Sequence, residues 1–277
     1  MMREDCTQVL KTPEIENFIR GNTSMKLYEI TFSPTGGTQK AADLLTEALG
    51  GERIAVDLTD RAADFSAVAF TPEDVAVIAV PSYGGRVPAA AVQRLETMKG
   101  SSARAVLVCV YGNRAYEDTL VELEDAAKQA GFRIIAAVAA IAEHSIVRRY
   151  AAGRPDAEDA KQLQAFAGKI GEKLSAGDDT QPEIPGNRPY KKAGGSGMVP
   201  KPTKECSGCG LCAQKCPVAA IDVQDPGHTD KDKCISCMRC VSICPKSARK
   251  VSSVMLTAAE MALKKVCSDR KTGELYI

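Results

Sequence analysis

Eight of the chain's 11 cysteines lie between Cys206 and Cys244, and they repeat one spacing twice. In each run two residues separate the first three cysteines, three residues precede the fourth, and a proline follows. The runs are Cys206, Cys209, Cys212 and Cys216, then Cys234, Cys237, Cys240 and Cys244. This spacing places successive thiolates on a tight loop that wraps three corners of a cubane cluster, so we predict two four-iron clusters. Zinc is the less favoured alternative, because zinc sites usually show two cysteine pairs, often with histidine.

A second group of candidate residues lies between Phe32 and Thr38, directly after an apolar run. Hydroxyls and glycine N–H groups that converge on the start of a helix bind phosphate. The loop lacks the Gly-Lys-Ser/Thr ending of a nucleoside triphosphate loop and the GxGxxG of a dinucleotide site. Taken alone, it also fits an ordinary capped turn. Its candidate phosphate contacts are Ser33, Thr35, Gly36, Gly37 and Thr38.

Two later loops carry aromatic rings, small residues and backbone amides, as a site for a flat aromatic ring requires. The candidate contacts are Ser82, Tyr83, Gly84 and Gly85 in one loop and Tyr111, Gly112, Asn113 and Tyr116 in the other. The chain has no tryptophan, so the stacking partner must be a tyrosine or phenylalanine. Any single tyrosine here also fits a residue that caps the core. We interpret His144, on the same rim, as a surface-loop histidine, with proton donation as the alternative.

Alternating strands and helices must position these loops. The predicted strands are 27–32, 53–57, 75–80, 105–110 and 133–141, and the predicted helices are 38–49, 88–98, 116–130 and 157–174. Short apolar strands between helices predict an α/β fold, a doubly wound five-stranded parallel sheet covered on both faces. With strand order 2-1-3-4-5, the carboxyl ends of strands 1, 3 and 4 are neighbours, so the three loops should lie together.

Composition divides the chain into five parts. We predict an N-terminal extension at 1–24, an α/β domain at 25–175, a Pro/Gly-rich linker at 176–203, a cysteine-rich domain at 204–251, and a helix with a polar tail at 252–277. Pro13–Arg20 can form a short amphipathic helix, and the last helix is expected over 257–266. The cysteine repeat is too short to bury a core, so its clusters must hold it together.

The cysteine runs resemble bacterial-type ferredoxins with two [4Fe–4S] clusters over about 204–251. That resemblance implies that the fourth cysteine of each run serves the other cluster, so Cys216 joins the second run and Cys244 joins the first. The first loop resembles the S-x-T-G-x-T phosphate loop of flavodoxins, with Gly37 where asparagine is frequent. This resemblance covers about 26–174 and implies FMN as the cofactor.

The order of the domains, with the loops YGGRVP and YGNRAY, resembles the fused flavodoxin–ferredoxin electron-transfer proteins of anaerobic metabolism, the EFR1-type family. The resemblance implies a carrier of low-potential electrons between FMN, two [4Fe–4S] clusters and partner redox enzymes. One chain with both cofactor types removes a diffusive step between them. Two alternatives stay open: a flavin-dependent reductase of a small substrate, fed by its own ferredoxin domain, and a binding module whose clusters only hold the fold.

Charge and hydropathy narrow the function further. With 36 Lys+Arg against 35 Asp+Glu, the chain has no basic excess that would indicate a nucleic-acid partner. No apolar stretch approaches the roughly 20 residues of a membrane helix, and the N-terminus lacks the apolar core of a signal peptide. We therefore predict a cytoplasmic protein without membrane insertion, whose partners are redox proteins.

Overall fold

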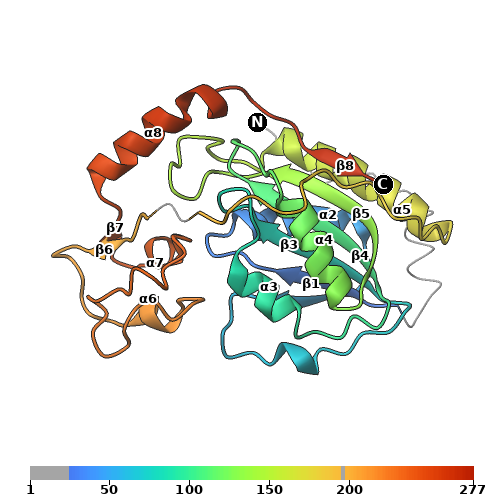
Figure 1. The fold of residues 1–277 in the computed structure, drawn as a ribbon, viewed down its shortest axis with the longest axis horizontal. Coiled ribbons are helices and arrows are strands. Elements are labelled where there is room, and N and C mark those ends of the chain that lie inside the picture. Colours follow the sequence, from blue (N-terminus) through green and yellow to red (C-terminus); the bar gives the residue numbers. More distant parts are fainter. Residues whose placement is uncertain (1–24, 195–196) are drawn as a thin grey trace, which may run out of the picture.

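The computed structural model describes residues 25–194 and 197–277, so the helix predicted over Pro13–Arg20 lies outside the described residues. Five parallel strands form most of one sheet (Figure 1). They are β1 (Leu27–Thr31), β2 (Arg53–Asp57), β3 (Val75–Pro81), β4 (Arg104–Tyr111) and β5 (Arg133–Ile141). Their order is β2-β1-β3-β4-β5, and each neighbouring pair is parallel. The predicted doubly wound α/β fold is confirmed.

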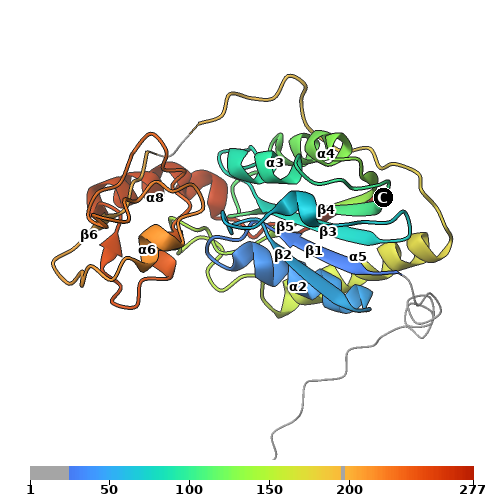
Figure 2. The ribbon, with the colours of Figure 1, turned by 90° about the horizontal axis from the view of Figure 1, so that it is seen from below.

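Two layers of helices cover this sheet because its central strands are apolar on both faces. The helices α2 (Gly37–Leu49) and α5 (Ala157–Ser175) pack on one face, where Leu45 and Ile170 join one buried cluster. The helices α3 (Ala89–Leu95) and α4 (Thr119–Gln129) pack on the other, as Figure 2 shows. Between β2 and β3 lies a short 3-10 helix over Phe65–Ala67.

The cysteine-rich segment, residues 201–250, has little regular structure. It contains the strands β6 (Lys201–Pro202) and β7 (Arg249–Lys250) and the helices α6 (Leu211–Gln214) and α7 (Arg239–Ser242). One short helix thus lies in each cysteine run, and the two strands pair antiparallel. Its largest buried cluster consists only of Ala213, Cys216, Ala220 and Ile221. So small a core agrees with the expectation that clusters hold this segment together.

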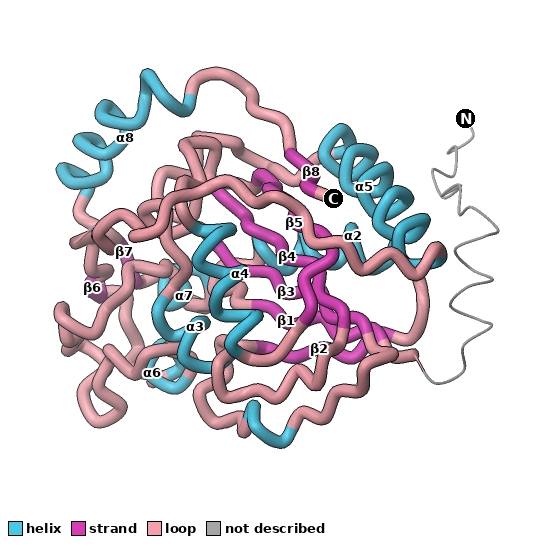
Figure 3. Tube along the Cα trace, turned by 45° about the vertical axis from the view of Figure 1, so that its right-hand side comes forward, coloured by secondary structure: helices cyan, strands magenta, loops and turns pink. Residues whose placement is uncertain are grey.

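The C-terminal segment, residues 253–277, returns to the α/β domain. Its helix α8 (Ser253–Cys267) leads away from the cysteine-rich segment, and its strand β8 (Glu274–Tyr276) lies beside β5 (Figures 1 and 3). The pairing is antiparallel and joins Ala137 to Tyr276 and Ala139 to Glu274. The prediction of a five-stranded sheet with a polar tail is therefore wrong by one strand. Three residues are too few to show the alternation that marks a strand.

The linker also lies on the α/β domain, along α4. The Asp118 carboxylate accepts hydrogen bonds from the backbone N–H groups of Asn187, at 2.9 Å, and Lys191, at 2.7 Å. Further along α4, Arg188 forms ion pairs with Glu124 at 2.8 Å and Asp125 at 2.7 Å. Residues 187–191 of the linker are therefore held against α4.

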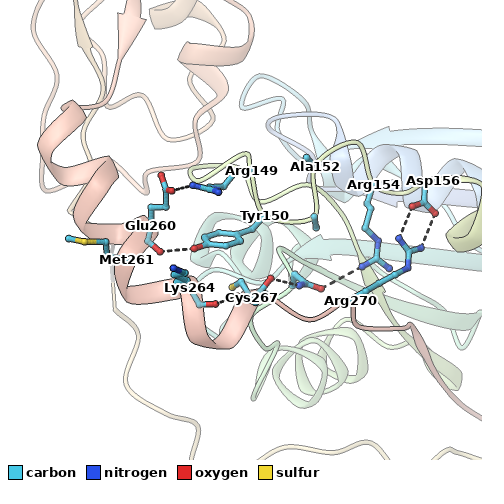
Figure 4. A pocket seen from close by; sticks show the side chains of 13 residues that line it. Arg149, Tyr150, Ala152, Arg154, Asp156, Glu260, Met261, Lys264, Cys267 and Arg270 are labelled. Atoms are coloured by element: carbon cyan, nitrogen blue, oxygen red, sulfur yellow. Dashed lines mark hydrogen bonds and ion pairs between the residues drawn. The ribbon is translucent and has the colours of Figure 1, made fainter.

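Asn113 anchors the C-terminal segment. Its buried side-chain amide donates to the carbonyl oxygens of Cys267, at 2.9 Å, and Asp269, at 2.8 Å, and its own oxygen accepts from the Lys271 N–H at 3.3 Å. Figure 4 shows the adjoining contacts. Among them, the Tyr150 hydroxyl donates a hydrogen bond to the Glu260 carbonyl at 2.6 Å. The cysteine-rich segment is therefore tied to the α/β domain on both sides.

Three arginines that line the cavity between α8 and residues 149–156 form ion pairs with carboxylates. Arg149 pairs with Glu260, and Arg270 pairs with Asp156 at 2.8 Å (Figure 4). The third arginine, Arg154, holds a carboxylate of α5. These ion pairs fix α8 and the segment after β5 against each other.

Among residues 25–194 and 197–277, no helix combines the length and the apolar character needed to cross a bilayer.

We predict that Asn113→Gly loosens the C-terminal segment. Asn113 has a φ of 66°, which glycine adopts freely, so this substitution removes the amide without straining the backbone. Losing these bonds should raise amide hydrogen exchange in residues 267–276 by about 10-fold or more. Asn187→Gly, which removes a side-chain amide from the linker instead, is the matched control. Unchanged exchange at 267–276 in Asn113→Gly would refute the anchor.

Candidate functional site

The phosphate loop, Ser33–Thr38, leads from β1 into α2. Gly36 precedes the helix with a φ of 92°, a left-handed conformation that favours glycine. The Ser33 hydroxyl accepts the N–H of Gln39 at 2.8 Å, and Thr38 is buried at the start of the helix. The first four N–H groups of a helix have no partner within it, so those before Gln39 are left for a ligand. The loop has the donors that a phosphate monoester requires.

A cavity of about 510 Å³, here called the ring cavity, lies at the carboxyl ends of β3, β4 and β5. Its volume is typical of small-molecule sites, which span about 300–1,000 Å³. Its floor includes Ser82, Tyr83, Gly84, Gly112 and His144 from the loops after these strands. Its other walls come from the linker, the cysteine-rich segment and α8, through residues that include Lys192, Ser236 and Leu263. Four parts of the chain thus line one site.

Half of the candidate ring contacts line this cavity, namely Ser82, Tyr83, Gly84 and Gly112. Gly85 does not line it and packs instead against Glu117, with which a Cβ at this position would collide. Asn113 binds the C-terminal segment instead, through both ends of its amide. The expected contact of Asn113 with the ring is therefore corrected.

Tyr111 and Tyr116 also lie elsewhere. Their rings pack against each other with centroids 5.3 Å apart, and Tyr111 is 5% exposed. The Tyr116 hydroxyl lies 2.7 Å from the Tyr276 hydroxyl and donates to Glu274 at 2.8 Å. These two tyrosines support β8 rather than a flavin, so Tyr83 is the one of the three candidates that faces the ring cavity.

Tyr83 also adjoins the second cysteine run. Burial, followed by the nearby Cys237 side chain, raises the pKa of the Tyr83 hydroxyl well above its usual value of 10. Ile235 and Ser236, which precede Cys237, line the ring cavity as well. The loop after β3 and the second cysteine run therefore meet at this cavity.

The cysteines of the two runs lie near one another. Cys206, Cys209, Cys212 and Cys244 line one hollow beside Arg249. Cys234 and Cys240, together with Cys212, pack against the buried cluster that contains Cys216, and Cys216 is near enough to Cys237 to affect its pKa. The fourth cysteine of each run thus lies near cysteines of the other run, and the assignment of ligands to each cluster stays a prediction.

The fourth cysteine of each run accepts a hydrogen bond from a backbone N–H group. The N–H of Ala220 donates to the Cys216 sulfur and that of Ala248 to the Cys244 sulfur, both at 3.3 Å. Burial raises the pKa values of Cys237 and Cys240 to about 12, so without a metal these thiols keep their protons at neutral pH. When iron is bound, their sulfurs would coordinate it as thiolates, because a coordinating thiol is deprotonated.

His144 is the residue that we interpreted from the sequence as a surface-loop histidine. It is half-buried and lines the ring cavity. Its Nδ1 accepts the N–H groups of Ile146 at 3.2 Å and Val147 at 3.1 Å, so the proton of the neutral ring lies on Nε2. A Cβ at Gly112 would come within 2.7 Å of the His144 ring, which explains the glycine after β4.

Comparison with known proteins identifies the cysteine-rich segment. Residues 205–252 match the family model of the 4Fe-4S dicluster domain. A curated relative, one subunit of the ion-translocating oxidoreductase complex of Methanosarcina acetivorans, is 43% identical over 44 residues. The match covers 16% of this chain and 17% of that protein's length.

Solved structures similar to the α/β domain include two flavodoxins and an oxidoreductase. A flavodoxin of Streptococcus pneumoniae is 17% identical, with 54% of this chain and 99% of that chain covered and a TM-score of 0.39. A flavodoxin of Fusobacterium nucleatum bound to flavin mononucleotide is 14% identical, with 53% and 98% covered and a TM-score of 0.39. The rubredoxin oxygen:oxidoreductase of Desulfovibrio gigas is 17% identical, with 55% and 36% covered and a TM-score of 0.40.

The strand order β2-β1-β3-β4-β5 itself defines the α/β domain as flavodoxin-like. The chain therefore joins a flavodoxin-like domain to a C-terminal 4Fe-4S dicluster domain. This pair of domains indicates electron transfer.

We predict that His144 titrates with a midpoint below 6.5, because burial lowers its pKa. The unfolded chain then binds this proton more readily than the folded one, so His144 lowers the free energy of unfolding as the pH falls below 6.5. Imidazole NMR of the oxidised protein measures the midpoint, and His144→Gln identifies the signal among two histidines. A midpoint at or above 6.5 is incompatible with a buried, neutral ring.

Proposed function

We propose that this protein is an electron carrier that passes low-potential electrons between FMN, two [4Fe–4S] clusters and partner redox proteins. The observation that carries the proposal is the position of the ring cavity. Tyr83 on its floor adjoins Cys237, and Ser236 forms part of its wall. A flavin ring in this cavity would lie beside the cluster that Cys237 helps to bind.

The residues fit both cofactors. Ser33, Thr35, Gly36, Gly37 and Thr38 would bind the FMN phosphate, and Tyr83 would stack on the ring, with Gly84 and Gly112 leaving room for it. Cys206, Cys209, Cys212 and Cys244 would bind one cluster, and Cys216, Cys234, Cys237 and Cys240 the other. When bound, FMN supplies two-electron chemistry and each cluster supplies one-electron chemistry.

The groups that line the ring cavity include both uncharged and cationic side chains. The Tyr83 hydroxyl stays protonated because its pKa is raised, and the His144 ring stays neutral because its pKa is lowered. Ala259, Ala262 and Leu263 of α8 exclude water from one side. Arg114, Lys191 and Lys192 also line the cavity, so positive charge would lie near an anionic reduced flavin.

We further propose that the electron donor and acceptor are redox proteins of anaerobic metabolism. The resemblance to fused flavodoxin–ferredoxin carriers supports this assignment. The formal charge of +1 gives no strong long-range field, so docking would depend on local patches.

A flavin-dependent reductase is the second candidate function, and His144 favours it. With Nδ1 held by two backbone N–H groups, Nε2–H is the proton that this ring can donate beside the cavity. Steady-state turnover that saturates with a small acceptor, and that falls in His144→Gln, would favour the reductase over the carrier.

The carrier predicts electron transfer within one molecule. The protein purified without oxygen should contain about eight irons, eight sulfides and one FMN. Electrons from its chemically reduced clusters should pass to the FMN of the same molecule at a rate independent of protein concentration. Rapid-mixing spectroscopy at several dilutions measures this rate, and protein stripped of flavin is the control. A rate that rises with concentration would exclude direct exchange between the domains, and bound zinc without labile sulfide would exclude the clusters.

The exchange of ligands predicts which cluster each cysteine serves. Cys216→Ala should damage the cluster bound by Cys234, Cys237 and Cys240, and Cys244→Ala the cluster bound by the first run. EPR of the reduced variants distinguishes the two clusters. Cys109→Ala is the matched control, since Cys109 is a buried thiol of β4 outside both runs. If Cys216→Ala instead damaged the cluster of the first run, or Cys244→Ala that of the second run, the assignment would be reversed.

A further inference from the structure

Arg239 brings a positive charge from the cysteine-rich segment to the phosphate loop. It is the first residue of α7, and its Nη1 donates to the backbone carbonyl of Ser33 at 3.5 Å. The two residues are 206 positions apart in the chain. Met238, just before Arg239, is buried in a left-handed conformation with a φ of 62°, so the start of α7 is well fixed.

The guanidinium of Arg239 has unused hydrogen-bonding capacity. Its Nε is buried and has no hydrogen-bond partner within residues 25–194 and 197–277. In the same described parts of the chain, no carboxylate forms an ion pair with Arg239, whereas Arg53, Arg86, Arg154 and Arg270 all have one. A buried N–H without an acceptor destabilises the protein, so this position calls for an anionic ligand.

The phosphate loop lacks what Arg239 offers. Between Ser33 and Thr38 it contains no lysine or arginine, so its own donors to a phosphate dianion are neutral. A guanidinium is always charged and presents several N–H groups in one plane, which suits phosphate oxygens. We propose that Arg239 completes the FMN phosphate site, so that residues of both domains bind one phosphate. This inference rests on the proposed function, because it requires FMN in the flavodoxin-like domain.

A second arginine between the domains provides the contrast. Arg94 of α3 donates to the Leu58 carbonyl and, at 2.5 Å, to the Pro217 carbonyl of the cysteine-rich segment. Its donors are thus bound to backbone oxygens of both domains. Arg94 is a structural link, whereas Arg239 has a donor free for a ligand.

One consequence is reciprocal coupling. If the phosphate binds groups of both domains, FMN stabilises the contact between them, and that contact strengthens FMN binding by the same factor. Riboflavin, which has the same ring without the phosphate, would not gain from this contact. Comparison of the two flavins therefore isolates the contribution of Arg239.

The test measures flavin affinity in the full chain with its clusters intact and its flavin removed. Fluorescence titrations with FMN and with riboflavin compare the wild-type protein, Arg239→Gln and the control Arg94→Gln. We expect Arg239→Gln to weaken FMN by about 10- to 100-fold, the effect of losing a charged hydrogen bond, and to leave riboflavin within about twofold. Arg239→Lys, which keeps the charge, should fall between these values, and Arg94→Gln should leave the ratio of the two affinities unchanged.

Two outcomes would overturn the inference. Equal weakening of both flavins by Arg239→Gln would mean that Arg239 only holds the domains together. Unchanged FMN affinity, with an altered EPR spectrum of the cluster beside Cys240, would mean that the guanidinium serves that cluster. If the wild-type chain binds neither flavin, the proposed function itself fails, which is a different result from failure of the Arg239 variants alone.

Discussion

The pairing of β8 with the edge of β5 determines where the cysteine-rich segment lies. The chain reaches this segment through a linker bound along α4, and it leaves through α8 to become the sixth strand of the same sheet. The segment is therefore held at two points rather than tethered at one. Its buried core is very small, so position and stability both depend on these attachments and on the clusters that its cysteines are expected to bind.

This double attachment also encloses the ring cavity. The carboxyl ends of parallel strands form an open crevice in this type of fold, and here other parts of the chain cover it. Ser236 and Leu263, which lie after the linker, reach the same cavity as Tyr83 and His144. The shifted pKa values of Tyr83 and His144 have burial as their largest cause, and that burial depends on this cover.

The sequence predicts the features that depend on local pattern. The five parallel strands follow from apolar runs separated by helices, and the 4Fe-4S dicluster domain follows from the spacing of its cysteines. Most of the errors involve the C-terminal segment. Asn113 and Tyr116 sit in a loop of the expected kind, but their partners lie about 150 to 160 residues further along the chain. The sequence around His144 is typical of a surface loop, but in the structure α8 and the linker cover this residue. The periodicity of the sequence contains no signal for such long-range contacts.

The position of β8 in the chain imposes an order on biosynthesis. The ribosome makes both cysteine runs before it makes Glu274–Tyr276, so β8 is the last part of the sheet to be synthesised. Until β8 pairs with β5, the cysteine-rich segment lacks its second attachment to the α/β domain, and the edge of β5 stays unpaired.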